Sequence, residues 1–209
     1  MKMNLPNKLT VLRLCLVPVI LVVGMLPASV IPHLISYVIC AVLFIGTAVT
    51  DMLDGKIARK HGLITDFGKF LDPVADKFMV IGALFVILYK FEDLRLLMIF
   101  TLIIVVFREL AVTSMRLVVS TGEGIVIAAN SLGKIKTVSQ IVAIYTVFLE
   151  PVVQYVARLV CEIITDRALV WRTDIIPLTL ATIVFSLVMT VWSGINYIAA
   201  YWKYLDPQK

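Results

Sequence analysis

The chain has 209 residues, of which 61% are hydrophobic and only 16% are charged, and its formal net charge is +5. Its mean hydropathy is +1.01. Soluble domains are roughly half apolar and about one quarter charged, so this composition excludes an ordinary soluble domain and indicates a polytopic membrane protein. Each spanning helix needs about 20 residues, which leaves room for about six spans and no sizeable soluble domain. In such a protein, excess positive charge favours contact with anionic lipid over nucleic acid.

Long apolar runs predict an all-α protein that forms a single integral membrane domain over residues 1–209. No A-x-A cleavage site follows the first run, so we expect a retained helix rather than a signal peptide. The third run begins at Asp72-Pro73, which suits an N-cap followed by the first helical residue. The expected transmembrane helices lie near residues 9–30, 33–53, 73–90, 96–119, 134–156 and 176–202.

Basic residues are concentrated on one side of these expected spans. The two ends of the chain, the loop after the second span and the loop after the fourth span are rich in Lys and Arg. By the positive-inside rule, both termini and the Asp-bearing loop face the cytoplasm. Residues 150–175 are amphipathic and carry two charge clusters, which favours a re-entrant or interfacial segment on the outer side.

Four aspartates stand in two short stretches that border apolar runs. A carboxylate at membrane depth costs roughly 2.5–3.5 kcal/mol, so four of them together need compensation. Asp51 and Asp54 are three residues apart, and Asp72 and Asp76 are four apart. Both spacings place the two members on one helical face, so neighbouring helices can present four carboxylates to one point. Hard oxygen ligands in that number suit Mg²⁺ or Mn²⁺.

Small and basic residues accompany these acids. Gly55 and Ala58 leave space for a ligand beside the first pair, and Gly68 permits a close approach of the backbone. Arg59 adds a fixed cation that suits a phosphate. Two aspartates at helical spacing are by themselves commonly a solvated helix end, but the complete string is far more specific. It reads Asp51-x₂-Asp54-Gly55-x₂-Ala58-Arg59-x₈-Gly68-x₃-Asp72-x₃-Asp76.

This string resembles the signature of the CDP-alcohol phosphotransferase family and matches it at every position. The resemblance implies a six-helix membrane enzyme, usually a homodimer, that transfers a substituted phosphoryl group from a CDP-alcohol to a hydroxyl acceptor and releases CMP. It implies two divalent cations, Mg²⁺ or Mn²⁺, held by Asp51, Asp54, Asp72 and Asp76. Asp76 is also the implied general base. The implied nucleotide and diphosphate site consists of Gly55, Ala58, Arg59 and Gly68.

Three further stretches bear on the acceptor, namely residues 4–14, 107–116 and 130–137. Their basic residues lie toward the cytoplasmic side by topology, and a basic pocket beside a metal centre suits an acceptor that carries phosphate. The candidate phosphate-binding residues are Arg108, Arg116, Lys134 and Lys136. The three stretches resemble bacterial members of the family, enzymes of the cytoplasmic membrane that use CDP-diacylglycerol as donor and sn-glycerol 3-phosphate as acceptor.

Other interpretations fit parts of the pattern. The same chemistry with phosphatidylglycerol, inositol phosphate or serine keeps the aspartate string and changes only the acceptor. A divalent-cation transporter is a more remote alternative, because intramembrane acids also line ion pathways. Lys134 and Lys136 also fit the positive-inside rule, and Arg108 also fits a structural ion pair with Glu109. Lys77 fits a structural or a lipid-facing role.

Overall fold

The computed structural model describes residues 3–63, 65–122, 131–165 and 177–202. Within these ranges the chain is helical and contains no strand, so the predicted all-α class is confirmed. The helices are α1 (Leu5–Met25), α2 (His33–His61), α3 (Asp66–Lys90), α4 (Arg95–Gly122), α5 (Ser131–Thr165) and α6 (Pro177–Tyr201), with the short 3₁₀ helix η1 (Glu92–Leu94) ahead of α4.

Four of the described helical segments are long and apolar enough to cross a membrane. They are Leu5–Met25, His33–Ala58, Glu92–Val119 and Pro177–Tyr201. These four candidate spans support the prediction of a polytopic membrane protein, whereas the expected count of six spans stays a prediction. The other two long helices, α3 and α5, carry several charged and amide side chains, and these side chains form much of the site described below.

Both α2 and α3 extend further into polar sequence than hydropathy predicts. α2 stops where Gly62 adopts a φ of 64°, a left-handed conformation that favours glycine. α3 begins directly after Thr65, because the Thr65 hydroxyl caps the helix by accepting from the backbone N–H of Gly68 at 3.1 Å. The expectation that this helix begins at Asp72-Pro73 is wrong, because Pro73 lies inside it.

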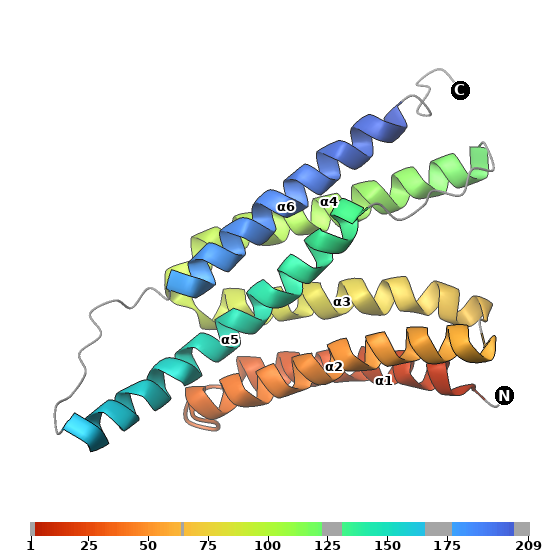
Figure 1. Cartoon of the computed structure of the whole chain (residues 1–209). Helices are drawn as coiled ribbons and strands as arrows, with labels where there is room; N and C mark the ends of the chain where they lie inside the picture. Colours follow the sequence, from red (N-terminus) through yellow and green to blue (C-terminus); the bar gives the residue numbers. More distant parts are fainter. Residues whose placement is uncertain (1–2, 64, 123–130, 166–176, 203–209) are drawn as a thin grey trace.

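The helices form two groups that α5 joins. α1 packs along both α2 and α3, whereas α2 and α3 contact each other at few positions. α4 packs on α3 and α6, and α5 packs on α6 and α2. Figure 1 shows the start of α1, the α2–α3 turn and the C-terminal ends of α4 and α6 toward the same side of the bundle. The acids beside the α2–α3 turn therefore lie toward one end of the molecule.

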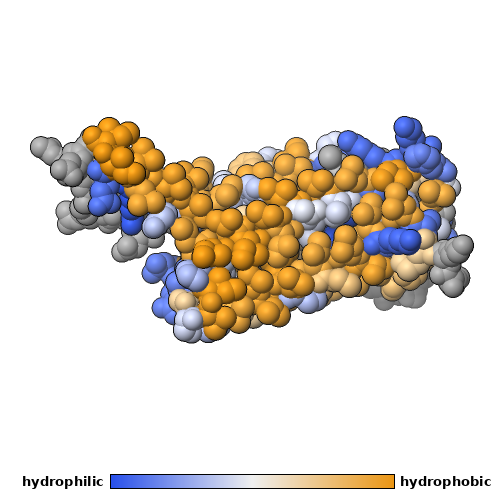
Figure 2. All heavy atoms as spheres, turned by 90° about the horizontal axis from the view of Figure 1, so that it is seen from below, coloured by the Kyte–Doolittle hydropathy of each residue, from blue (hydrophilic) through white to orange (hydrophobic). Residues whose placement is uncertain are grey.

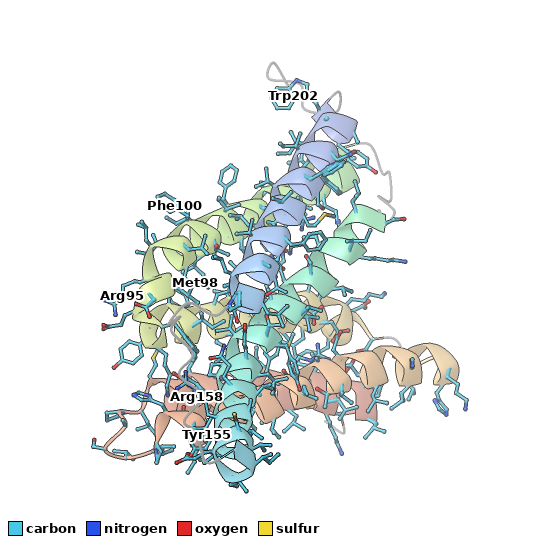
Figure 3. All side chains as sticks on the ribbon, turned by 60° about the vertical axis from the view of Figure 1, so that its left-hand side comes forward. Arg95, Met98, Phe100, Tyr155, Arg158 and Trp202 are labelled. Atoms are coloured by element: carbon cyan, nitrogen blue, oxygen red, sulfur yellow. The ribbon has the colours of Figure 1, made fainter. Side chains whose placement is uncertain are left out.

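Large hydrophobic side chains lie on the surface of the bundle as well as in its core. Phe44, Met98 and Phe148 are fully buried between the helices. Phe100, only two residues after Met98 on α4, points outward and is 56% exposed (Figure 3). On the face seen in Figure 2, hydrophobic residues cover the middle and hydrophilic residues gather toward the two ends. An apolar belt between polar ends suits a protein surrounded by lipid.

The described part of the segment expected to be re-entrant or interfacial continues α5 as a helix. Residues 150–165 belong to α5, whose C-terminal half extends beyond the other helices in Figure 1. Ile163 and Ile164 are 82% and 75% exposed there. The described residues therefore contain no re-entrant turn, and an interfacial position for them stays a prediction. Residues 166–175 lie outside the described part of the chain.

Candidate active site

The carboxylates of two helices converge on one arginine of a third. Asp51 and Asp54 lie on α2, Asp76 lies on α3, and Arg13 lies on α1. The Arg13 guanidinium is 2.8 Å from Asp51 Oδ1 and 2.8 Å from Asp76 Oδ1, both through Nη1. Its Nη2 is 2.5 Å from Asp54 Oδ2. Three of the four aspartates in the string are thus brought together around a single cation.

The fourth aspartate, Asp72, joins the cluster through Thr10. The Thr10 hydroxyl donates to Asp72 Oδ1 at 2.7 Å and lies 3.4 Å from Asp54 Oδ2. Thr10 and Arg13 are three residues apart and therefore share one face of α1. Because α1 packs on both α2 and α3, this face supplies the polar contacts that hold all four acids in one place.

The cluster has a closed side and an open side. The side chain of Arg13 is 0% exposed and that of Asp54 is 6% exposed, whereas Asp51 and Asp76 are 47% and 51% exposed. A buried guanidinium is stable only when anionic partners replace its lost hydration. Arg13 therefore depends on the buried acid, and the open side presents the carboxylates that a ligand reaches first.

Two asparagines fasten the start of α1 to the α2–α3 turn. Asn4 caps α1 by accepting from the Asn7 backbone N–H at 3.1 Å, and its side-chain amide donates to a backbone carbonyl of the turn at 3.1 Å. The Thr65 hydroxyl donates to Asn7 Oδ1 at 3.1 Å. A Cβ atom at Gly68 would lie 3.0 Å from the same Oδ1, which explains the small residue there. Residues 4–14, expected beside the acceptor, thus lie against the acids.

The residues expected to bind the nucleotide and diphosphate follow the acids along α2 and α3. Gly55 and Ala58 are half-buried on α2, and Gly68 is buried on α3. The side chain of Arg59 lies outside the described part of the chain, although its backbone continues α2. The role of these four residues stays a prediction.

The chemistry of the acidic cluster fits a divalent cation. Carboxylate oxygens are the ligands that Mg²⁺ and Mn²⁺ prefer, and the acids already converge on one cationic group. Among the described residues, no three carboxylate, imidazole or thiolate groups lie close enough together, as they stand, to hold a metal ion. Arg13 lies where the carboxylates converge, so a metal ion that binds them must share or displace the contacts of Arg13.

A cavity of about 460 Å³ leads from the acids to basic residues on neighbouring helices. Asp72 and Asp76 of α3 line its acidic side. Its other lining residues include Lys77, Glu109, Thr113, Arg116, Lys136 and Gln140. Two of the candidate phosphate-binding residues, Arg116 and Lys136, therefore share one cavity with the candidate general base.

An acidic residue lies among the basic ones. Lys136 on α5 is 5% exposed, and its ammonium group contacts the Glu109 carboxylate on α4. Arg108 Nη1 lies 3.0 Å from the same carboxylate oxygen, and Arg108 Nη2 donates to the Ser193 hydroxyl on α6 at 2.7 Å. Arg108 borders a separate apolar cavity between α4 and α6, so the structure does not bring it into the cavity that holds the acids.

Two lysines lie elsewhere than the sequence suggests. Lys134 is exposed and borders an apolar groove with Val138 of α5 and Phe185 of α6, away from the acids. Lys77 lines the cavity and donates to the Thr113 hydroxyl of α4. An ionisable residue inside an apolar helix is the signal that marks Lys77 as a candidate, since such residues are commonly functional.

The sequence also did not link Arg13 and Thr10 to the acids. An arginine inside the first apolar run is an available signal, because a buried cation there needs an anionic partner. Nothing in the local sequence names that partner, since the packing of α1 between α2 and α3 is a tertiary feature.

The profile of the CDP-alcohol phosphatidyltransferase family matches residues 3–192. The chain belongs to this family. A Bacillus subtilis protein named CDP-diacylglycerol–glycerol-3-phosphate 3-phosphatidyltransferase is 43% identical over 155 residues, which cover 70% of this chain and 77% of that protein. Proteins of the same name from Pectobacterium atrosepticum and Sodalis glossinidius are each 30% identical. The first match covers 99% of this chain and 100% of the relative, and the second covers 96% of each.

The family expected from the aspartate string is therefore confirmed, and the chain is an enzyme that transfers a phosphatidyl-type group. The names of the three relatives specify CDP-diacylglycerol and glycerol 3-phosphate, which are the donor and acceptor suggested by the basic stretches.

Proposed function

We propose that the protein transfers the phosphatidyl group of CDP-diacylglycerol to sn-glycerol 3-phosphate, giving phosphatidylglycerophosphate and CMP. One observation carries the proposal. A single cavity joins the carboxylates of Asp72 and Asp76 to the cationic groups of Lys77, Arg116 and Lys136. An acceptor with a hydroxyl group at one end and a phosphate at the other matches this distribution of charge. The names of the three relatives support the same pair of substrates.

The proposed chemistry is a direct displacement at phosphorus. The 1-hydroxyl oxygen of glycerol 3-phosphate attacks the phosphorus that bears diacylglycerol and forms a new P–O bond. The bond from that phosphorus to the CMP oxygen breaks, and CMP leaves with the bonding electrons. Asp76 lines the cavity and is half exposed, so its carboxylate is the proposed general base that takes the hydroxyl proton. No covalent enzyme intermediate is needed.

Two divalent cations, Mg²⁺ or Mn²⁺, are part of the proposal. Asp51, Asp54, Asp72 and Asp76 are the residues that would hold them. When bound, such ions neutralise the diphosphate and stabilise the leaving CMP. The convergence of the four acids on Arg13 and Thr10 supports this assignment.

The donor nucleotide is proposed to lie along the ends of α2 and α3 that flank the acids. Gly55, Ala58 and Gly68 carry little or no side chain, which leaves the helix backbones accessible to a ligand. Arg59 is the proposed cation for the diphosphate.

The acceptor phosphate is proposed to bind Arg116 and Lys136. Lys77 joins them because it lines the same cavity. Arg108 and Lys134, which the sequence grouped with these residues, lie elsewhere. We propose a structural role for Arg108, between α4 and α6, and contact with anionic lipid headgroups for Lys134.

We also propose six membrane spans, with α3 and α5 completing the set, and a homodimer in a bacterial cytoplasmic membrane. The distribution of Lys and Arg supports cytoplasmic termini and a cytoplasmic site. The position of the acids beside the α2–α3 turn, toward the same side as the start of α1, is consistent with this orientation (Figure 1). A site there receives a soluble phosphate ester from the cytoplasm while the acyl chains of the donor stay in lipid.

Purified protein supplied with CDP-diacylglycerol and one acceptor at a time tests this function. We expect CMP release with glycerol 3-phosphate and none with phosphatidylglycerol, inositol phosphate or serine. Release with serine but not with glycerol 3-phosphate would refute the acceptor. EDTA should abolish the reaction, and Mg²⁺ or Mn²⁺ should restore it. Metal flux into liposomes without CMP formation would instead favour a divalent-cation transporter.

A further inference from the structure

Arg13 is the largest fully buried side chain among the described residues, and it carries a charge. Its guanidinium contacts Asp51 and Asp54 of α2 and Asp76 of α3 at 2.5–2.8 Å. Lys136, which is proposed to bind the acceptor phosphate, instead pairs with Glu109. Its position therefore relates to the carboxylates and not to the acceptor.

The packing of the helices explains why such a residue is needed. α2 and α3 carry the acids, yet they contact each other at few positions and pack mainly on α1. Arg13 Nη1 contacts both Asp51 and Asp76, so one nitrogen bridges the two helices. When all four acids are ionised, their charge exceeds that of Arg13, and the cluster still attracts a divalent cation.

We propose that Arg13 is the resident counter-cation of the acidic site. It holds the carboxylates of α2 and α3 together before a metal ion binds, and it yields them when the ion arrives. Arg13 is in this view a positioning residue, and its presence weakens metal binding while it stabilises the protein without metal. The proposal rests on the proposed function, because it takes the four aspartates as metal ligands.

The test is to measure thermal unfolding and Mn²⁺ binding for full-length protein and its Arg13→Gln variant. In EDTA, we expect the variant to unfold at a lower temperature than wild type, because its acids repel one another. Saturating Mn²⁺ should restore most of that loss. By calorimetry, the Kd for Mn²⁺ should fall by about tenfold or more, since a cation next to the ligands no longer opposes the ion.

Two further variants make the test decisive. Arg95→Gln removes an exposed arginine that pairs with Glu92 at 3.0 Å, far from the acids, and should leave both measurements unchanged. Arg13→Lys keeps the charge with a shorter reach, so both measurements should fall between wild type and Arg13→Gln. If Arg13→Gln does not fold even with Mn²⁺, Arg13→Lys alone decides, and wild-type values for it would overturn the role of Arg13.

The outcomes separate this role from the function on which it rests. Mn²⁺ binding by wild type, with unchanged affinity and EDTA stability in both Arg13 variants, would overturn the counter-cation role alone. A weaker Mn²⁺ affinity in Arg13→Gln would also overturn it, because a purely structural arginine predicts that result. A wild-type protein that binds no Mn²⁺ would overturn the metal ligands of the proposed function and, with them, the competition at Arg13.

Discussion

Two lysines on one turn of α5 allow a sharp test of the acceptor site. Lys136 is 5% exposed and lines the cavity that contains the acids, whereas Lys134 is exposed and borders an apolar groove. The perturbation is Lys136→Met, with Lys134→Met as its matched control. Both changes remove one positive charge and leave an unbranched side chain of similar length, so only the position differs.

The expected magnitude follows from the surroundings of Lys136. A hydrogen bond to a charged group contributes roughly 1.5–3 kcal/mol, and Lys136 is desolvated enough for that range to apply. Each 1.4 kcal/mol is a factor of ten, so Lys136→Met should lower kcat/KM for glycerol 3-phosphate about 10- to 100-fold. Glu109 keeps its contact with Arg108 at 3.0 Å, so the variant should remain folded.

The assay is CMP release at saturating CDP-diacylglycerol with glycerol 3-phosphate varied. Lys134→Met should stay within about twofold of wild type, as surface substitutions usually do. The KM for CDP-diacylglycerol should not change in either variant. A normal kcat/KM in Lys136→Met, or equal losses in the two variants, would show that the cavity does not bind the acceptor phosphate.

Three further substitutions test other parts of the site. Asp76→Asn should lower turnover about 10²- to 10⁴-fold while CDP-diacylglycerol still binds, and near-normal turnover would exclude this base. The control Asp66→Asn changes an exposed aspartate earlier on α3 and should leave turnover unchanged. Arg108→Met should lower the free energy of unfolding by roughly 1.5–3 kcal/mol in thermal unfolding, because its contacts with Glu109 and Ser193 are lost. Its KM for glycerol 3-phosphate should stay within about threefold of wild type, because Arg108 borders a separate cavity away from the acids. Glu109→Gln should unfold at a lower temperature yet gain more stability than wild type from added inorganic phosphate; an equal gain would argue against competition at Lys136.

Hydropathy predicted which parts of the chain are helical but not where the helices end. It detects residues that suit lipid, and a helix continues into polar sequence until a turn residue or a cap stops it. α2 therefore runs on to Gly62, and α3 begins after Thr65. The expected N-cap at Asp72 has the right local chemistry, but Thr65 caps the helix two turns earlier, and Pro73 is accommodated inside.

Helical periodicity predicted the acidic pairs because each pair lies within a single helix. The same periodicity cannot say which helix faces these pairs. The contacts of Arg13 and Thr10 on α1 with the acids therefore could not be inferred from the sequence. The two lysines of α5 show a related difficulty. Positions two residues apart point about 200° away from each other, but α5 is apolar on several sides. The sequence therefore did not indicate that Lys136, rather than Lys134, faces the cavity.

Both charged groups of this site contain one residue of the opposite sign. Arg13 lies among the acids, and Glu109 lies between Arg108 and Lys136. In an apolar bundle an unpaired charge is costly, so each internal counter-ion stabilises its group before any substrate binds. Under the proposals above, a metal ion at the acids would replace Arg13, and a phosphate at Lys136 would replace Glu109, which keeps its contact with Arg108.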